Sequence, residues 1–215
     1  TGVLNVIEAR DITEVILGMH RRAGMIDPFF GNKVDKLLRS TNRMILISRC
    51  YIPLNTVTRI VVWVPYHAQY ETGFSRWVRC VARLTRQIGC RVIFCSCADA
   101  QPLIRGVIYR ENYGIRCEFR TMDANDDYVL LANKILDDDL FVIIGARANS
   151  VSYSSSVAEL PQFLQRYFSS NNLLIVYPEQ FGESPALTSF VDPMSTDIAS
   201  TPSPLWLKIK NIWRR

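Results

Sequence analysis

One strand–turn–helix–strand pattern occurs twice in this 215-residue chain. In each copy an apolar strand ends at a glycine, and a polar loop, an amphipathic helix and a second apolar strand follow. The first copy comprises a strand over 13–17, Gly18, a helix over 30–39 and a strand over 44–48. The second comprises a strand over 140–144, Gly145, a helix over 157–167 and a strand over 173–177. Only the second copy has further alternating elements in front of it, so we expect the chain to be a piece of a longer protein.

The segment in front of the second copy alternates strands with helices, which predicts a parallel sheet. The β-branched run over 60–64 is typical of a parallel strand that is covered on both faces. Further strands are predicted over 91–97 and 117–122, and helices over 74–88, 102–113 and 126–136. The fold class is therefore α/β: a three-layer, doubly wound, mostly parallel five-stranded sheet, preceded by the C-terminal half of a second such unit. The predicted parts are 1–55, 56–182 and 183–215.

Composition excludes several classes of function. The chain is 48% hydrophobic, yet no window approaches 18 consecutive apolar residues, and no signal peptide is recognisable, which predicts a soluble piece. The six cysteines are irregularly spaced and fit reduced thiols in a cytosolic compartment. Two histidines are too few to favour a zinc site, and no metal is expected. The net charge of +5 is scattered along the chain, so nucleic acid is not an expected partner.

The five strands and four helices predicted over 56–182 resemble the universal stress protein domain. In many members of that family, the loop after the fourth strand carries Gly-x2-Gly-x9-Gly-Ser/Thr, whose backbone N–H groups hold the phosphates of ATP. In the first copy the residues at that spacing are Gly18, Arg21, Gly31 and Asn32, and in the second copy they are Gly145, Ala148, Ala158 and Glu159. Most of the glycines are replaced, and Glu159 would repel a phosphate.

The resemblance and the local chemistry together give candidate residues for binding ATP, AMP, another nucleotide or a small anion. They are Gly18, His20, Arg21, Arg22, Gly31 and Asn32 in the first copy, and Gly145, Arg147, Ser152 and Ser154 in the second. For the hydroxyls over 150–156, helix capping and turn formation are the alternative. His20 has the alternative of an ordinary loop residue, and so does His67, which lies beside Tyr66 and Tyr70.

The acidic residues also have two interpretations. Asp123, Asp126 and Asp127, with the run over 137–139, suggest a metal site. Alternatively, Asp126 and Asp127 stabilise the start of a helix, and the run over 137–139 is a solvated turn, which we take as the default. No nucleophile stands at a recognisable spacing from a base, and we therefore expect no enzymatic activity.

Several short motifs point to a narrower family. They are Ile12-Thr-Glu-Val-Ile-Leu-Gly-Met-His20, Phe29-Phe30-Gly31, Asp138-Asp139-Leu140, Ala146-Arg147, Ser152-Tyr153 and Tyr177-Pro178-Glu179-Gln180. Together they resemble the cytoplasmic C-terminal region of bacterial cation/proton antiporters of the Bacteroidetes type, which carries tandem stress-protein-like domains. The resemblance implies a non-catalytic regulatory or assembly domain of a sodium/proton antiporter, on the cytoplasmic side of the bacterial inner membrane. It also implies two partners, the membrane transport domain of the same protein and a second copy in a homodimer.

Two other functions remain open at this point. One is a structural dimerisation module without a ligand, which the eroded glycine motif favours. The other is a stand-alone, nucleotide-binding universal stress protein, which intact glycine motifs would support.

The C-terminal part has a composition of its own. Residues 183–204 are rich in Ser, Thr and Pro, which predicts a linker. A basic amphipathic helix is predicted over 205–215, with an apolar side formed by Leu205, Trp206, Ile209, Ile212 and Trp213. Such a helix suits a membrane surface, a neighbouring domain or its own domain.

Overall fold

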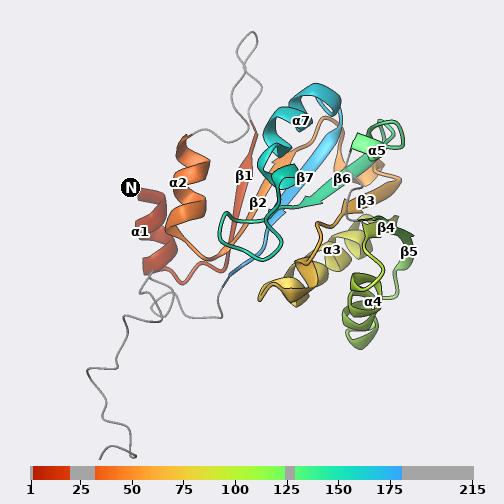
Figure 1. Ribbon diagram of the computed structural model, residues 1–215, viewed down its shortest axis with the longest axis horizontal. Coiled ribbons are helices and arrows are strands. Elements are labelled where there is room, and N and C mark those ends of the chain that lie inside the picture. Colours follow the sequence, from red (N-terminus) through yellow and green to blue (C-terminus); the bar gives the residue numbers. More distant parts are fainter. Residues whose placement is uncertain (1, 20–31, 124–128, 181–215) are drawn as a thin grey trace, which may run out of the picture. The chain divides into compact units, whose positions relative to one another are not determined.

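The computed structural model describes residues 2–19, 32–123 and 129–180, which form a single seven-stranded sheet with helices (Figure 1). The strand order is β1-β2-β7-β6-β3-β4-β5. The strands are β1 (Glu14–Gly18), β2 (Met44–Arg49), β3 (Arg59–Trp63), β4 (Arg91–Ser96), β5 (Arg116–Thr121), β6 (Asp139–Ile144) and β7 (Asn172–Tyr177). All neighbouring strands are parallel except β2 and β7, which are antiparallel.

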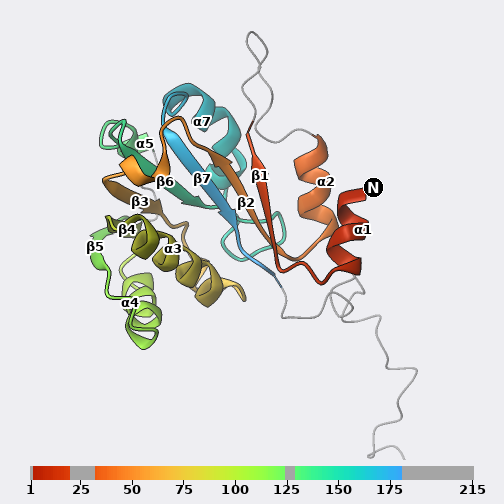
Figure 2. The ribbon, with the colours of Figure 1, turned by 180° about the vertical axis from the view of Figure 1, so that it is seen from behind.

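Helices cover both faces of the sheet, as the reverse view also shows (Figure 2). They are α1 (Gly2–Ala9), α2 (Asn32–Ser40), α3 (Phe74–Ile88), α4 (Ala100–Arg110), α5 (Val129–Ala132), α6 (Ser155–Ala158) and α7 (Leu160–Tyr167), with short 3-10 turns at Leu54–Thr56 and Ala68–Tyr70. One apolar cluster packs α3 and α4 against the sheet, and a second packs α1, α2, α5 and α7 against the opposite face. The predicted three-layer, doubly wound, mostly parallel class is confirmed.

We call residues 1–55 the half unit and residues 56–182 the complete unit. The sheet has seven strands because β1 and β2 of the half unit join the five strands of the complete unit. Leu46 and Leu174 face one apolar cluster, and Ile47 and Ile175 face the other. Antiparallel pairing of β2 with β7 therefore buries apolar side chains on both faces of the junction. The periodicity predicted the strands of both units, whereas the pairing between the units depends on long-range contacts.

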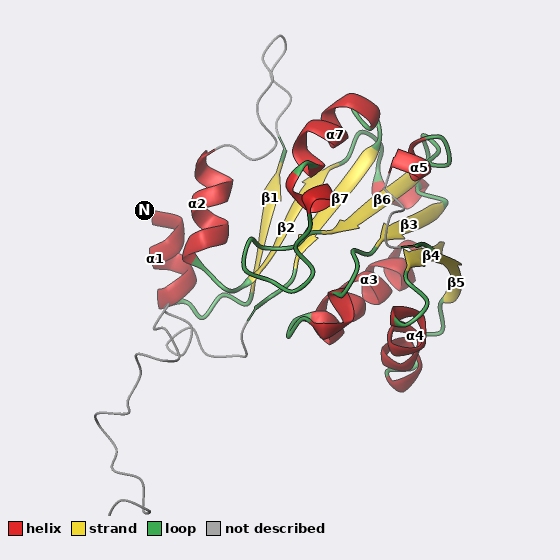
Figure 3. Cartoon of the chain, viewed as in Figure 1, coloured by secondary structure: helices red, strands yellow, loops and turns green. Residues whose placement is uncertain are grey.

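Local signals explain two features of the helices (Figure 3). Helix α3 has the predicted bounds, buries Trp77 and Val81, and ends at Gly89, whose φ of 78° is the left-handed conformation that glycine adopts at helix ends. The helix predicted over 157–167 is instead divided into α6 and α7. Pro161 lies in the first turn of α7, and a proline inside a continuous helix would remove a hydrogen bond.

Some predicted elements differ in extent or lie outside the described residues. Helix α5 spans Val129–Ala132, and residues 124–128 of the predicted 126–136 helix are not described. The linker and the amphipathic helix predicted over 183–215 also lie outside the described ranges. Within the described ranges, none of the helices combines the length and the apolar character needed to span a bilayer.

The two copies of the repeat are related by an approximate two-fold axis at the β2–β7 junction. Ile47 and Ile175 form the middle pair of this junction. One residue further along each strand, the carbonyl oxygen of Ser48 accepts a hydrogen bond from the N–H of Met19, and that of Val176 accepts one from Gly145, both at 2.8 Å. Met19, and not Gly18, therefore occupies the position equivalent to Gly145.

Candidate functional site

The strand order places the candidate site at the carboxyl ends of the strands of the complete unit. β3 lies between β4 and β6, so the chain continues from β3 to one side of the sheet and from β6 to the other. In doubly wound sheets, ligands bind outside the carboxyl ends of the strands at this switch point. The loops that meet there follow β3, over residues 64–73, and β6, over residues 145–154.

The two loops are joined by a carboxylate that the sequence analysis did not single out. Glu71 Oε1 accepts hydrogen bonds from the backbone N–H of Ser152, at 2.9 Å, and from its Oγ, at 2.7 Å. Ser152 is buried. Its hydroxyl, which was predicted to meet an anion, and its amide both donate to a carboxylate of the same chain. A single glutamate in a loop carries no sequence signal for such a partner.

The neighbouring hydroxyls have structural roles as well. Ser154 Oγ accepts from the N–H of Val157 at 3.4 Å and so caps the start of α6. Ser150 Oγ donates to the carbonyl oxygen of Arg147 at 2.9 Å. These contacts agree with the capping and turn interpretation of the 150–156 segment.

Arg147 is directed into the protein. Its guanidinium donates hydrogen bonds to three backbone carbonyl oxygens of the half unit: those of Leu38, of Thr41 at 2.6 Å and of Arg43 at 2.7 Å. The residue is only 7% exposed, and burial lowers the pKa of its guanidinium to about 10, which leaves it charged at neutral pH. The guanidinium of this arginine, which was predicted to bind an anion, contacts carbonyl oxygens at the end of α2 and before β2.

A second arginine makes the reciprocal contact. Arg49 ends β2 of the half unit and donates to the carbonyl oxygens of Phe168 and Asn171, in the segment between α7 and β7 of the complete unit. We call Arg49 and Arg147 the arginine clasp. The two residues cross the β2–β7 junction in opposite directions: Arg147 reaches the end of α2 and the segment before β2, and Arg49 reaches the segment before β7. The clasp joins the two units.

Gly145 has a packing function. A Cβ atom at this position would lie 2.7 Å from the Tyr177 ring, a distance that real Cβ contacts do not show. Tyr177 is buried against this strand end, and burial raises the pKa of its phenol. A side chain at 145 would therefore force the Tyr177 ring to move, which is a reason for glycine that is independent of any phosphate.

Of the candidates in the first copy, Gly18 lies at the opposite end of the strands from Gly145. Because β2 is antiparallel to β7, the carboxyl end of β1 points away from that of β6. Gly18 ends β1, and a Cβ atom there would meet nothing within 4 Å. Asn32 begins α2, but its side chain is not described, and His20, Arg21, Arg22 and Gly31 lie outside the described residues. Gly18 and Asn32 therefore do not lie beside Gly145.

The switch-point loop that follows β3 also carries exposed aromatic rings. His67 has a left-handed backbone, with φ of 66°, and its ring lies 5.2 Å from that of Tyr66 and 5.9 Å from that of Tyr70. Tyr70 is 67% exposed. The structure thus brings together the three residues that the sequence suggested, on the surface of the loop that follows β3.

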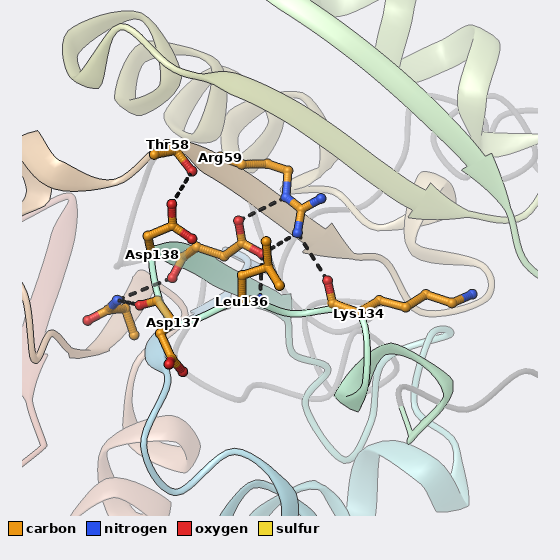
Figure 4. A network of polar contacts seen from close by, with 8 residues as sticks. Thr58, Arg59, Lys134, Leu136, Asp137 and Asp138 are labelled. Carbon is orange, nitrogen blue, oxygen red and sulfur yellow. Dashed lines mark hydrogen bonds and ion pairs between the residues drawn. The ribbon is translucent and has the colours of Figure 1, made fainter.

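At the amino end of β6, opposite the switch-point loops, a buried polar network surrounds Asp139 (Figure 4). Asp139 is fully buried and forms an ion pair with Arg59, whose Nε donates to Asp139 Oδ1 at 2.8 Å. The backbone N–H of Leu136 donates to Asp139 Oδ2 at 2.8 Å, and Arg59 also donates to the carbonyl oxygen of Lys134 at 3.0 Å. The hydrogen bond to Asp139 raises the pKa of Arg59.

Two neighbouring groups complete this network. Asp138 accepts from Thr58 Oγ1 at 2.8 Å. Asn172 Nδ2 donates to the carbonyl oxygens of Asp137 and Asp139, while Asn172 Oδ1 accepts from the N–H of Tyr51 at 2.8 Å. The expectation of a solvated turn over 137–139 is correct for the exposed Asp137 and wrong for Asp139, because the first residue of β6 faces Arg59 of β3. Nowhere in the described ranges do three or more His, Cys, Asp or Glu side chains gather in a way that could hold a metal.

All six cysteines are free thiols. Cys95 and Cys97 are buried in the core, whereas Cys50 is exposed. Burial raises the pKa of Cys80 and of Cys95 to about 11, which keeps both thiols protonated at neutral pH. A protonated thiol is a poor nucleophile, so these two cysteines are packing residues.

Comparison with known proteins finds similarity in structure alone. No protein-family model matches the sequence, and no curated protein matches it significantly. The fold resembles the cytoplasmic domain of a prokaryotic cation chloride cotransporter, with a TM-score of 0.51 and 8% identity over 86% of this chain and 73% of that one. It also resembles a universal stress protein from Archaeoglobus fulgidus, with a TM-score of 0.46 and 11% identity over 82% of this chain and 65% of that one. The chain therefore shares the mostly parallel, doubly wound α/β fold of the cotransporter domain.

Proposed function

We propose that this chain is a non-catalytic cytoplasmic domain that regulates or assembles a membrane cation transporter, specifically a sodium/proton antiporter. The observation that carries the proposal is that the polar groups of the switch-point loops are engaged within the chain: Arg147 with three carbonyl oxygens, and Ser152 with Glu71. A nucleotide would have to displace these contacts. The transporter class is supported by the motifs of the sequence and by the likeness in fold to a cotransporter's cytoplasmic domain.

The proposed role rests on the junction between the two units. Pairing of β2 with β7 and the arginine clasp hold the half unit and the complete unit in one register. A domain of this kind acts by presenting fixed surfaces to the membrane transport domain of the same protein and to a second copy in a homodimer. Ion movement would take place in the transport domain.

The antiporter function is tested in proteoliposomes that contain the full-length protein and maintain a pH gradient. Adding Na⁺ is expected to dissipate the gradient, as reported by a pH-sensitive dye. Arg147→Met, which removes one half of the clasp, is expected to change the Na⁺ concentration at half-maximal rate without abolishing exchange. Absence of cation-dependent proton movement would overturn the antiporter assignment, and an unchanged concentration dependence in the variant would overturn the regulatory role.

Calorimetric titration of the purified chain with ATP and AMP distinguishes an assembly function from a nucleotide-sensing function. We expect no saturable heat for either nucleotide, because a phosphate at the β6 loop would meet the Glu71 carboxylate. Glu71→Gln is the matched control, since it keeps an acceptor for Ser152 and removes the negative charge. Saturable binding by the unmodified chain would favour the sensing function.

A further inference from the structure

Strand β1 is the part of the sheet that differs most from its equivalent in the other copy. Within the described residues β1 ends the sheet and pairs only with β2. Its five residues alternate between exposed and half-buried, whereas all six residues of its equivalent, β6, are buried. Both strands have apolar sequences. The contrast therefore comes from what covers them.

The two-fold relation identifies the missing neighbour. Ile16 pairs with Leu46 as Val142 pairs with Leu174, so Ile16 and Val142 are equivalent. Ile16 is 71% exposed, and Val142 is 0% exposed. Val142 is covered because β3 pairs in parallel with the outer edge of β6, and because α3, which follows β3, lies over that face. The described residues contain no equivalent of β3 and α3 next to β1.

The strand at the other end of the sheet, β5, has the features of a solvent-exposed edge strand. β5 places the charged side chains of Arg116, Glu118 and Arg120 in solvent, and such charges discourage pairing with another strand. The outward residues of β1 are Glu14, Ile16 and Gly18, with a single charge among them. That charge is engaged, because Glu14 Oε1 lies 3.6 Å from a guanidinium nitrogen of Arg76 on α3. β1 thus lacks the charges that protect β5.

We infer that β1 is a docking edge for a parallel β-strand followed by an amphipathic helix, equivalent to β3 and α3. The two-fold relation of the copies assigns this strand to residues that precede Gly2 in the full-length protein, in the order that the complete unit shows. A second copy of the chain is the less suitable occupant, because two β1 edges related by a two-fold axis would pair antiparallel, whereas β3 joins β6 in parallel. This inference does not depend on the transporter function.

The test compares the 215-residue chain with the full-length protein by amide hydrogen exchange and by thermal unfolding. In the full-length protein we expect slower exchange of the β1 amides. Ile16→Lys is expected to leave the Tm of the 215-residue chain unchanged within about 1 °C, since Ile16 is exposed there. In the full-length protein the same change buries a lysine and is expected to lower the Tm of this domain by about 5 °C or more.

The matched control is Arg116→Lys, which alters an exposed outward residue of β5 without changing its charge and should leave both proteins unchanged. Equal β1 exchange in the two proteins, with Ile16→Lys silent in both, would overturn the inference. Protection of β1 that appears in the 215-residue chain only at high protein concentration would overturn it in favour of a second copy. Neither outcome bears on cation exchange, so this test fails separately from the test of the proposed function.

Discussion

Replacing Asp139 with alanine is expected to lower the free energy of unfolding by about 3–5 kcal/mol, the cost of removing one partner of a buried ion pair. The change leaves Arg59, whose side chain is 14% exposed, without its carboxylate, and it leaves the N–H of Leu136 without an acceptor. Urea unfolding followed by circular dichroism measures the loss.

Asp137→Ala is the matched control for this prediction. Asp137 lies in the same acidic run but is exposed, and its contact with Asn172 uses the backbone carbonyl, which alanine retains. We expect a change within about 0.5 kcal/mol. Equal effects of the two substitutions would show that the run is a solvated turn and that the Arg59–Asp139 pair does not stabilise the fold.

The second large effect is expected at Arg147. Arg147→Met keeps much of the apolar stem but removes the guanidinium from the carbonyl oxygens of Leu38, Thr41 and Arg43. Hydrogen bonds to a charged group contribute about 1.5–3 kcal/mol each and are not additive, and unpaired buried carbonyls add a further cost. We therefore expect a loss of about 3–5 kcal/mol, measured by the same urea titration.

Two comparisons make the Arg147 prediction specific. Arg86→Met alters an exposed arginine in the last turn of α3 and is expected to change stability by less than about 0.5 kcal/mol. Inorganic phosphate serves as the probe for anion binding. If phosphate raised the Tm of the unmodified chain and not that of Arg147→Met, Arg147 would be an anion ligand and the clasp assignment would be wrong.

The site shows where reasoning from sequence stops. Spacing and glycine positions marked the loop after β6, and the structure places Arg147, Ser152 and Ser154 there. Their partners lie far away in the chain: Arg147 contacts residues more than 100 positions earlier, and Ser152 contacts Glu71. Asp139 was assigned to a solvated turn for the same reason, since the β3–β6 pairing that brings Arg59 next to it is a long-range contact.

The residue-by-residue alignment of the two copies follows from the strand pairing in the sheet and not from the sequence. Matching Gly18 to Gly145 is natural in the sequence, because both glycines follow an apolar run. In a strand, consecutive residues point to opposite faces, so a shift of one residue would exchange the two faces. Val15 and Phe141 pack in the same apolar cluster, as do Leu17 and Ile143. Val15 is therefore equivalent to Phe141, and Leu17 to Ile143. A match of Gly18 with Gly145 would pair residues that face opposite sides of the sheet, so Met19 occupies the position of Gly145.

Local patterns in the chain were sufficient for the element order, the parallel α/β class and the helix that ends at Gly89, because hydrophobic periodicity and glycine conformation act over a few residues. The number of strands in the sheet, the clasp across the β2–β7 junction and the exposure of Ile16 on β1 came from the three-dimensional arrangement. Each depends on which distant segments pack together, and hydrophobic periodicity shows that a segment is buried but not which distant segment it packs against.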